Sequence, residues 1–394
     1  MNQKVFFIGG VFPESFDKYF EKKYYKRPDV SSLLYGREFL KGLLKVVPNP
    51  KITVFSVPQV GSYPITSKKE WVHFRSNVSF LRPVNYHSAI GLRHVSQICS
   101  LKKQLRKELK TFARGEHVTI IVENAYLPYL SAVNSICKSK RFTFDITVIV
   151  PDLPEYVGKL YSKNCVLGFA KNRYVAKTYK IIDQTNCQLV LFSPAMRDRD
   201  VIGGKRNFVS CGITSLEKLI ECEKKRKKLV FVGKLSSENL AKEMIDAFML
   251  IEDSSISFDI VGDGDEMPYA KKAAAVDKRI HLWGFLSPTE AEAIQIQASA
   301  IIALRAPTKM SAYSFPSKLV RALVHDVPVV ALDLPCYTDN IRNCLIIPQD
   351  ASVKEISKAI ATALSDVSIN RQERTKFMAS INNVRLVERI LKDH

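Results

Sequence analysis

Eleven short apolar runs recur along this chain, and longer amphipathic segments separate them. The first five runs occupy residues 4–9, 52–57, 118–123, 145–150 and 188–193, and the other six occupy 228–233, 258–262, 279–284, 300–304, 327–332 and 344–348. Runs of this length without polar alternation are typical of strands buried on both faces of a parallel sheet. Amphipathic segments between them, such as 239–251 and 288–299, predict helices. The pattern therefore predicts an α/β fold with doubly wound parallel sheets.

The length of the chain predicts two such domains, because 394 residues exceed what one core usually holds. We place the first domain at 1–212 and the second at 213–370. The linker falls in 212–228, which ends in five basic residues; a solvated helix end leading into the next strand accounts for that run equally well. Residues 371–394 are predicted to form a helix that crosses back to the first domain.

Nearly all of the excess of positive over negative charge lies in the first half of the chain. Residues 1–215 hold 34 Lys and Arg against 15 Asp and Glu, a net charge of +19, whereas residues 216–394 hold 25 against 24. Such polarity predicts one acidic partner: an anionic membrane, a nucleic acid or a phosphate-bearing acceptor. No nucleic-acid reader motif accompanies the charge, so we disfavour nucleic acid.

The amino terminus and the cysteines indicate the compartment. The first apolar run breaks at Gly9 and Gly10 and has no cleavage site, and no later run approaches the roughly 18 apolar residues that span a bilayer. The eight cysteines are scattered, without a C-x-x-C pair, and are read as reduced thiols. We therefore expect a cytoplasmic protein, held at a membrane surface if at all.

Ligands of doubly wound domains bind beyond the carboxyl ends of the strands, and four such turns of the second half suit a ligand. They are Gly233-Lys234, the turn 262–265, Gly284-Phe285 and the segment 311–318. In the last of these, Ser314 is expected to cap a helix that begins near Pro316. Lys318 would then lie in the first helical turn, where a cation is unfavourable unless an anion joins it. We predict a diphosphate there; the alternative is a surface lysine that extends into solvent.

The motifs VFVGKL, FDIVGDG, WGFLSPTEAEAI and SFPSKLVRALVHDVPVVALDLP follow one another over roughly 120 residues. This order resembles the donor-binding domain of the family 4 retaining glycosyltransferases, which have the GT-B fold, and especially bacterial members that make capsule and other surface polysaccharides. The first half matches more loosely, through IGGVFP, TVIVPDLPEY and LFSPAM. The resemblance implies two Rossmann-like domains that face a cleft.

The resemblance also implies a function for these turns. A nucleotide-activated sugar would bind with its diphosphate on Lys318, Ser317 and Lys234 and its base near Phe285, and transfer would need no metal or other cofactor. The expected donor-binding residues are Gly233, Lys234, Gly262, Asp263, Phe285, Arg305, Tyr313, Ser314, Phe315, Pro316, Ser317, Lys318, Leu319 and Arg321.

Several positions depart from the family pattern. Two glutamates that face the sugar and the ribose are replaced here by Tyr313 and Arg321, and the glycine that ends the helix is replaced by Asp326. A second basic residue that contacts the phosphates is replaced by Asn239, with Lys242 one helical turn away as a possible substitute. This chain therefore lacks side chains with which the family usually binds the ribose and the phosphates of the nucleotide.

The acceptor is expected on the first domain. Asp152 and Glu123 end predicted central strands and are candidate catalytic residues, although a strand-end carboxylate is as often a cap or loop ligand. Gly9 and Gly10 permit close approach of an acceptor to the backbone. Asp263 and Asp265 resemble the pair of acidic residues that binds manganese in other glycosyltransferases. Their position in a glycine turn after a strand disfavours a metal site.

Two basic stretches favour an anionic membrane and a lipid-diphosphate acceptor. Residues 100–115 place leucines on one helical face and cations around the rest, and residues 20–28 mix aromatic residues with cations. For the first stretch, a core-packed helix with a solvated basic face is an equal alternative.

We therefore expect a glycosyltransferase that passes a sugar from a nucleotide diphosphate to a lipid-linked or glycan acceptor with retention. The main rival is a non-catalytic glycosyltransferase-like subunit or glycan-binding partner, suggested by Tyr313 and Arg321. A nucleotide-sugar epimerase of similar architecture is disfavoured because it needs acidic residues near the sugar. The sequence leaves the oligomeric state open.

Overall fold

The computed structural model describes residues 4–16, 30–59, 70–89, 91–139, 141–156, 165–223, 227–365 and 367–392. Contacts between Cα atoms divide the chain into two units. The first unit consists of Met1–Ser215 with Asn383–His394, and the second consists of Leu216–Asn382. None of the helices in the described ranges combines the length and the apolarity that a membrane crossing demands.

Seven parallel strands form the main sheet of the first unit, in the order β4-β2-β1-β6-β7-β8-β9. They are β1 (Lys4–Gly9), β2 (Ile52–Ser56), β4 (Leu81–Pro83), β6 (His117–Glu123), β7 (Thr143–Val150), β8 (Gln188–Leu191) and β9 (Asn207–Val209). A short antiparallel pair, β3 (Trp71–Val72) and β5 (Tyr86–His87), accompanies it. The five strands predicted in the first half are present, whereas the short strands β3, β4, β5 and β9 escaped prediction.

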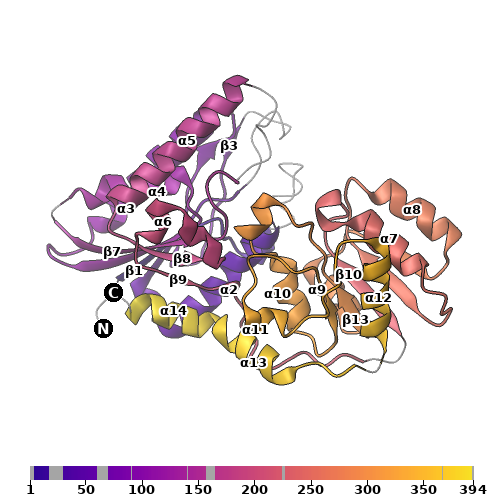
Figure 1. Ribbon diagram of the computed structural model, residues 1–394. Helices are drawn as coiled ribbons and strands as arrows, with labels where there is room; N and C mark the ends of the chain where they lie inside the picture. Colours follow the sequence, from indigo (N-terminus) through magenta and orange to yellow (C-terminus); the bar gives the residue numbers. More distant parts are fainter. Residues whose placement is uncertain are drawn as a thin grey trace. The chain divides into compact units, whose positions relative to one another are not determined.

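Helices cover both faces of this sheet, as the doubly wound pattern predicts. The helices of the first unit are α2 (Val30–Val46), α3 (Leu92–Leu109), α4 (Leu127–Cys137), α5 (Cys165–Gln184), α6 (Asp200–Gly203) and α14 (Asn383–Lys392), with the 3₁₀ turns η1 (Glu14–Phe16), η2 (Asn49–Lys51) and η3 (Pro194–Asp198). Figure 1 shows α3, α4 and α5 on one face of the sheet and α2 with α14 on the other. The stacked rings of Phe7 and Phe39, 5.2 Å apart, join β1 to α2.

The second unit holds a five-stranded parallel sheet in the order β12-β11-β10-β13-β14. Its strands are β10 (Lys228–Val232), β11 (Ser257–Val261), β12 (Ile280–Gly284), β13 (Ala300–Ile302) and β14 (Val329–Val330). Its helices are α7 (Ala241–Met249), α8 (Met267–Val276), α9 (Pro288–Gln295), α10 (Ser317–Leu323), α11 (Asp339–Arg342), α12 (Val353–Leu364) and α13 (Arg371–Ser380), with the 3₁₀ turns η4 (Ser237–Asn239) and η5 (Lys309–Ala312). Helices α7 and α12 pack together beside the core of Leu229, Phe231, Phe248 and Phe258.

Two expectations about the carboxyl-terminal part need correction. Residues 344–348 form no strand, because only an isolated bridge joins Ile346 to Val330. The single long helix expected over 371–393 is two helices, α13 in the second unit and α14 in the first. Asn383, the first residue of α14, donates its amide N–H to Thr214 O at 2.9 Å and its Nδ2 to Glu38 O at 3.0 Å. The chain end thus returns to the first unit, as expected.

Asp326, at the position where the glycosyltransferases that the sequence resembles end this helix with glycine, connects three segments of the second unit. The buried carboxylate accepts hydrogen bonds from Cys222 N and from Arg371 Nη2, each at 2.8 Å. Its backbone N–H donates to Ile220 O at 3.0 Å. The departure from glycine therefore fastens both the segment before β10 and helix α13 to the end of α10.

Replacing Asp326 by glycine should destabilise the protein, although it restores the family residue. Loss of a buried carboxylate that accepts two hydrogen bonds, one from an arginine, should lower the free energy of unfolding by about 2–4 kcal/mol, as measured by urea titration. Asp333→Gly is the matched control, because Asp333 forms an exposed pair with Arg342 and should contribute less than about 1 kcal/mol. Equal effects of the two substitutions would contradict the assignment.

Candidate functional site

The loops after β10, β11 and β12 approach each other closely at the carboxyl edge of the second sheet. Gly233 N donates to Val261 O at 2.9 Å, and Gly262 N donates to Gly284 O at 2.7 Å. Gly262 has a φ of +139°, and a Cβ atom there would lie 1.8 Å from Gly233 O. Only glycine fits this position, so three of the four predicted turns do meet at one edge.

Lys318 joins this edge from helix α10. Its partly buried ammonium donates hydrogen bonds to Asn239 Oδ1 at 2.6 Å and to Leu304 O at 2.5 Å. It also lies 5.3 Å from the centroid of the Phe231 ring. Lys318 is therefore held among the strand ends, and the alternative of a lysine extended into solvent is wrong.

Arg305 brings a second cation to the same place. Its Nη2 donates to Ser314 Oγ at 3.3 Å. Burial, and next the charge of Arg305, lower the pKa of Lys318 to about 7. Among the described residues, neither cation has a carboxylate within 4.0 Å. Two neighbouring cations without a counter-ion make this edge attractive to an anion.

Helix α10 begins later than the sequence suggests. Its N-cap is Pro316, and Ser317 is the first helical residue. Ser314 is therefore not the cap: its buried hydroxyl is the acceptor for Arg305. Phe315 is buried with its ring 5.7 Å from that of Tyr337, in an edge-on contact. Proline has no side-chain oxygen, so the cap residue itself accepts no hydrogen bond from the first amides of α10.

The other predicted donor-site residues differ in how they are placed. Leu319 is fully buried and belongs to the core. Phe285 exposes 47% of its surface beside the end of β12, where a flat ligand could stack on it. Tyr313 is partly buried at the end of η5. Burial tends to raise the pKa of Glu292, but a hydrogen bond and the charge of His325, and then the charge of Arg321, lower it below its ordinary value.

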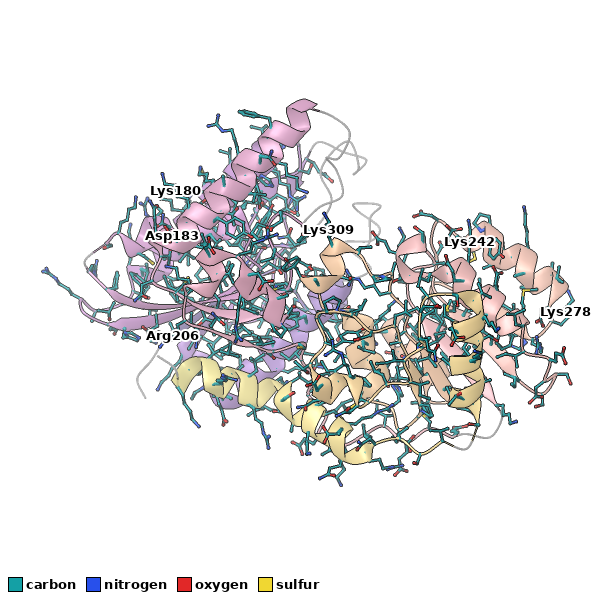
Figure 2. All side chains as sticks on the ribbon, in the orientation of Figure 1. Lys180, Asp183, Arg206, Lys242, Lys278 and Lys309 are labelled. Atoms are coloured by element: carbon teal, nitrogen blue, oxygen red, sulfur yellow. The ribbon has the colours of Figure 1, made fainter. Side chains whose placement is uncertain are left out.

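The exposed basic residues of the site already have acidic partners. Lys234 Nζ lies 3.0 Å from Asp265 Oδ2, and both side chains are largely exposed. Lys242, labelled in Figure 2, lies 3.1 Å from Glu266 Oε2, so it does not replace the missing basic residue at Asn239 in this structure. Asp263 is exposed and accepts a hydrogen bond from Gly264 N. Within the described ranges, no group of three or more His, Cys, Asp or Glu side chains could hold a metal ion.

In the first unit, Glu123 and the glycine pair meet at the end of β1. The buried carboxylate accepts a hydrogen bond from Gly10 N at 2.8 Å. A Cβ atom at Gly9 would lie 2.3 Å from Glu123 Oε2, and one at Gly36 would lie 2.8 Å from Oε1. Glycines thus make room for the carboxylate. Its contacts suit a residue that orders the Gly9-Gly10 turn better than one that meets an acceptor directly. Asp152 is partly buried in the turn after β7.

A polar and aromatic cluster at the carboxyl edge of the first sheet escaped prediction. Arg93 Nη2 donates to Gln59 Oε1 at 3.0 Å, and Gln59 Nε2 donates to the Tyr129 hydroxyl at 2.5 Å. The ring of Tyr126 lies 5.0 Å from that of Tyr129 and 5.6 Å from that of His94. The sequence signal was the pair of tyrosines in NAYLPYL, directly after the run at 118–123.

Comparison with known proteins agrees with this architecture. Residues 226–366 match the family model described as glycosyl transferases group 1. No match was found among curated protein sequences.

Three solved structures resemble the chain over nearly its whole length. The lipopolysaccharide outer core galactosyltransferase WaaB, in its apo form, has a TM-score of 0.60 at 13% identity and covers 99% of each chain. Sucrose-phosphate synthase from Thermosynechococcus elongatus has a TM-score of 0.63 at 12% identity, covering 99% of this chain and 98% of its own. Anabaena HepE in complex with UDP has a TM-score of 0.62 at 12% identity and covers 99% of each chain.

Such identities establish the fold and not the substrate. The expected fold class is confirmed: the chain has the GT-B fold of two Rossmann-like units, and its second unit carries the group 1 glycosyltransferase match.

Proposed function

We propose that the protein transfers a sugar from a nucleotide diphosphate to a lipid-linked or glycan acceptor, with retention, in the synthesis of a surface polysaccharide. One observation carries the proposal: Lys318 and Arg305 lie near enough to interact electrostatically, and neither has a carboxylate partner among the described residues, beside loops that glycines bring together. This edge lies within the segment that matches glycosyl transferases group 1.

The chemistry of sugar transfer explains why these cations would matter. When the bond from the sugar to the diphosphate breaks, negative charge grows on the leaving diphosphate. Cations that are fixed beforehand stabilise that charge without reorganising, which lowers the barrier. Lys318 and Arg305 would do this, and Lys234 would add a solvent-screened contribution after leaving Asp265. We propose that no metal is needed.

The acceptor would bind to the first unit, near the turn that Glu123 orders. We further propose that this unit works at the cytoplasmic face of an anionic membrane. Helix α3 supports this: it buries Leu101, Leu105 and Leu109 and exposes Lys103, Arg106, Lys107 and Lys110. It is thus a core-packed helix with a solvated basic face, available to phospholipid head groups. The basic stretch 20–28 lies outside the described residues.

The direct test supplies nucleotide sugars to the purified protein together with a lipid-diphosphate sugar acceptor in anionic vesicles. UDP-glucose is the first donor to try, because HepE was solved in complex with it, followed by other UDP-, GDP- and dTDP-sugars. Transfer, or donor hydrolysis, by at least one pairing is expected. Absence of both with every pairing would refute the enzyme.

The membrane role has its own test, co-sedimentation of the protein with vesicles. Vesicles without anionic lipid should retain less protein than anionic vesicles; equal retention would refute the membrane role.

A second candidate function is a non-catalytic subunit that binds a nucleotide or glycan. It is favoured by Arg321, which takes the place of the family's ribose-binding glutamate and lies near Glu292. Calorimetry separates the two: binding of UDP or GDP without turnover, with every acceptor tried, would support the subunit.

The affinity for UDP should fall as the pH rises above 7. Lys318 has a pKa of about 7 in the free protein, so its charged fraction falls through neutrality, and the bound diphosphate must restore the proton. The dissociation constant should rise by up to roughly tenfold per pH unit between pH 7 and 9, with uptake of about one proton per UDP at pH 8. Calorimetry in buffers of different ionisation enthalpy measures this uptake. Lys318→Arg, which stays charged, should bind UDP without the dependence; a pH-independent wild type would contradict the prediction.

A further inference from the structure

The carboxyl edge of the second sheet, with the loops after β10, β11 and β12 and with Lys318 and Arg305, is called the donor edge below. The side chain of Asn239 connects two parts of it. Its Oδ1 accepts a hydrogen bond from Lys318 Nζ at 2.6 Å, and its Nδ2 donates to Lys234 O at 2.7 Å. Asn239 thus links helix α10 to the loop after β10. The family resemblance predicts a basic residue at this position, so the amide is a feature of this chain.

The chemistry of the two neighbours fixes the orientation of this amide. An ammonium only donates and a backbone carbonyl only accepts, so Oδ1 must face Lys318 and Nδ2 must face Lys234 O. A flipped amide would place two donors together and two acceptors together. The carbonyl of Asn239 is therefore a directed acceptor for the lysine.

Lys318 keeps one donor for a ligand. An ammonium has three N–H groups, and Asn239 Oδ1 and Leu304 O accept two of them. Beyond the face of the Phe231 ring, 5.3 Å away, the third meets no oxygen or nitrogen acceptor within the described part of the chain. Because the lysine is held at two points, the direction of its third N–H is set before a ligand arrives.

We propose that Asn239 is a positioning residue of the donor site, which orients the third N–H of Lys318 toward the diphosphate of the nucleotide sugar. The inference rests on the proposed function, because it names how that site binds its anion. A neutral amide suits this task. An arginine or lysine at position 239 would repel Lys318. A carboxylate there would form an ion pair with Lys318 and so reduce its attraction for the diphosphate.

The charges that surround Lys318 come from several elements. Arg305 follows β13, and its positive charge disfavours the charged form of Lys318. The exposed pair of Lys234 and Asp265 lies on the loops after β10 and β11, and Lys242 of α7 is paired with Glu266. A carboxylate at position 239 would be the first in direct contact with Lys318 within the described residues.

Asn239→Asp tests the proposal, with Asn340→Asp as a control that makes the same charge change at an exposed position of α11. We expect Asn239→Asp to weaken UDP binding at pH 7 at least tenfold and to raise the titration midpoint of Lys318 by at least one pH unit. The midpoint is followed by NMR of protein labelled with 13C at lysine Cε, with the signal assigned through Lys318→Arg. Asn239→Leu should weaken UDP binding three- to tenfold, and Asn340→Asp should change neither quantity.

The outcomes separate this inference from the proposed function. An unchanged UDP affinity in Asn239→Asp, or a reduced affinity with an unchanged Lys318 midpoint, would overturn the positioning role. If the wild type binds no nucleoside diphosphate, the proposed function fails. The midpoint still reports whether Asn239 holds Lys318, because that titration needs no ligand.

Discussion

Replacing Lys318 by alanine is expected to weaken UDP binding by about 1.5–3 kcal/mol, roughly 10- to 150-fold, because a hydrogen bond to a charged group is lost. The effect on sugar transfer should be larger, roughly 100- to 1,000-fold, since the lysine would stabilise charge that develops only as the diphosphate leaves. Calorimetry measures the first quantity, and the rate of sugar transfer at saturating donor measures the second.

Lys309→Ala is the matched control, because Lys309 lies nine residues before Lys318, in η5, but is exposed (Figure 2). It should leave binding and transfer within about twofold of the wild type, as for other surface substitutions. Lys234→Ala should have an intermediate effect, since its side chain is half exposed and its ammonium already pairs with Asp265. Wild-type affinity in Lys318→Ala would remove the lysine from the site and with it the basis of the proposal.

The sequence predicted the architecture well because buried parallel strands leave a strong local pattern. The run at 228–233, for example, is interrupted by no charge between Leu229 and Gly233, and it became β10. The run at 344–348 has the same apolar character, but it forms no strand. Its Ile346 donates to Val329 O and accepts from Ala331 N, and Pro348 then offers no N–H to continue the ladder.

The sequence also predicted which loops form the donor edge. It could not predict the hydrogen-bond partners of the side chains in those loops. A lysine in the first turn of a helix was unusual enough to single out Lys318. That Leu304 O and Asn239 Oδ1 would hold it depends on residues 14 and 79 positions away, which no local pattern encodes. Ser314 was misassigned as a cap for the same reason, because Arg305 takes its hydroxyl.

Glu123 shows why a strand-end carboxylate cannot be assigned a role from sequence alone. Because Glu123 ends a predicted central strand of a glycosyltransferase-like domain, the sequence makes it a candidate catalytic residue. The structure instead places the carboxylate against Gly9, Gly10 and Gly36, with Gly10 N as a donor. Such a buried carboxylate determines where the loop after β1 lies, so under the proposed function it would act on an acceptor only through that loop. Its effect would be indirect.

Gly262→Ala is expected to have the largest effect on stability in the second unit. Its φ of +139° is rarely adopted by residues with a side chain, and the new Cβ would lie 1.8 Å from Gly233 O. Strain and overlap together should lower the free energy of unfolding by about 4 kcal/mol or more, or prevent recovery of folded protein. Urea titration of the soluble protein measures the loss, and calorimetry should show no UDP binding.

Gly284→Ala separates the two causes. Gly284 also has a positive φ, +67°, but among the described residues, its two chain neighbours aside, no heavy atom lies within 4 Å of the position that its Cβ would take. It should therefore lose only about 1–2 kcal/mol, the usual cost of left-handed backbone in a residue with a side chain. The difference between the two variants isolates the contact between the loops after β10 and β11. If Gly262→Ala were no less stable than Gly284→Ala, the two loops would not be held together as described. The cations of the donor edge would then lack the fixed backbone on which their role depends.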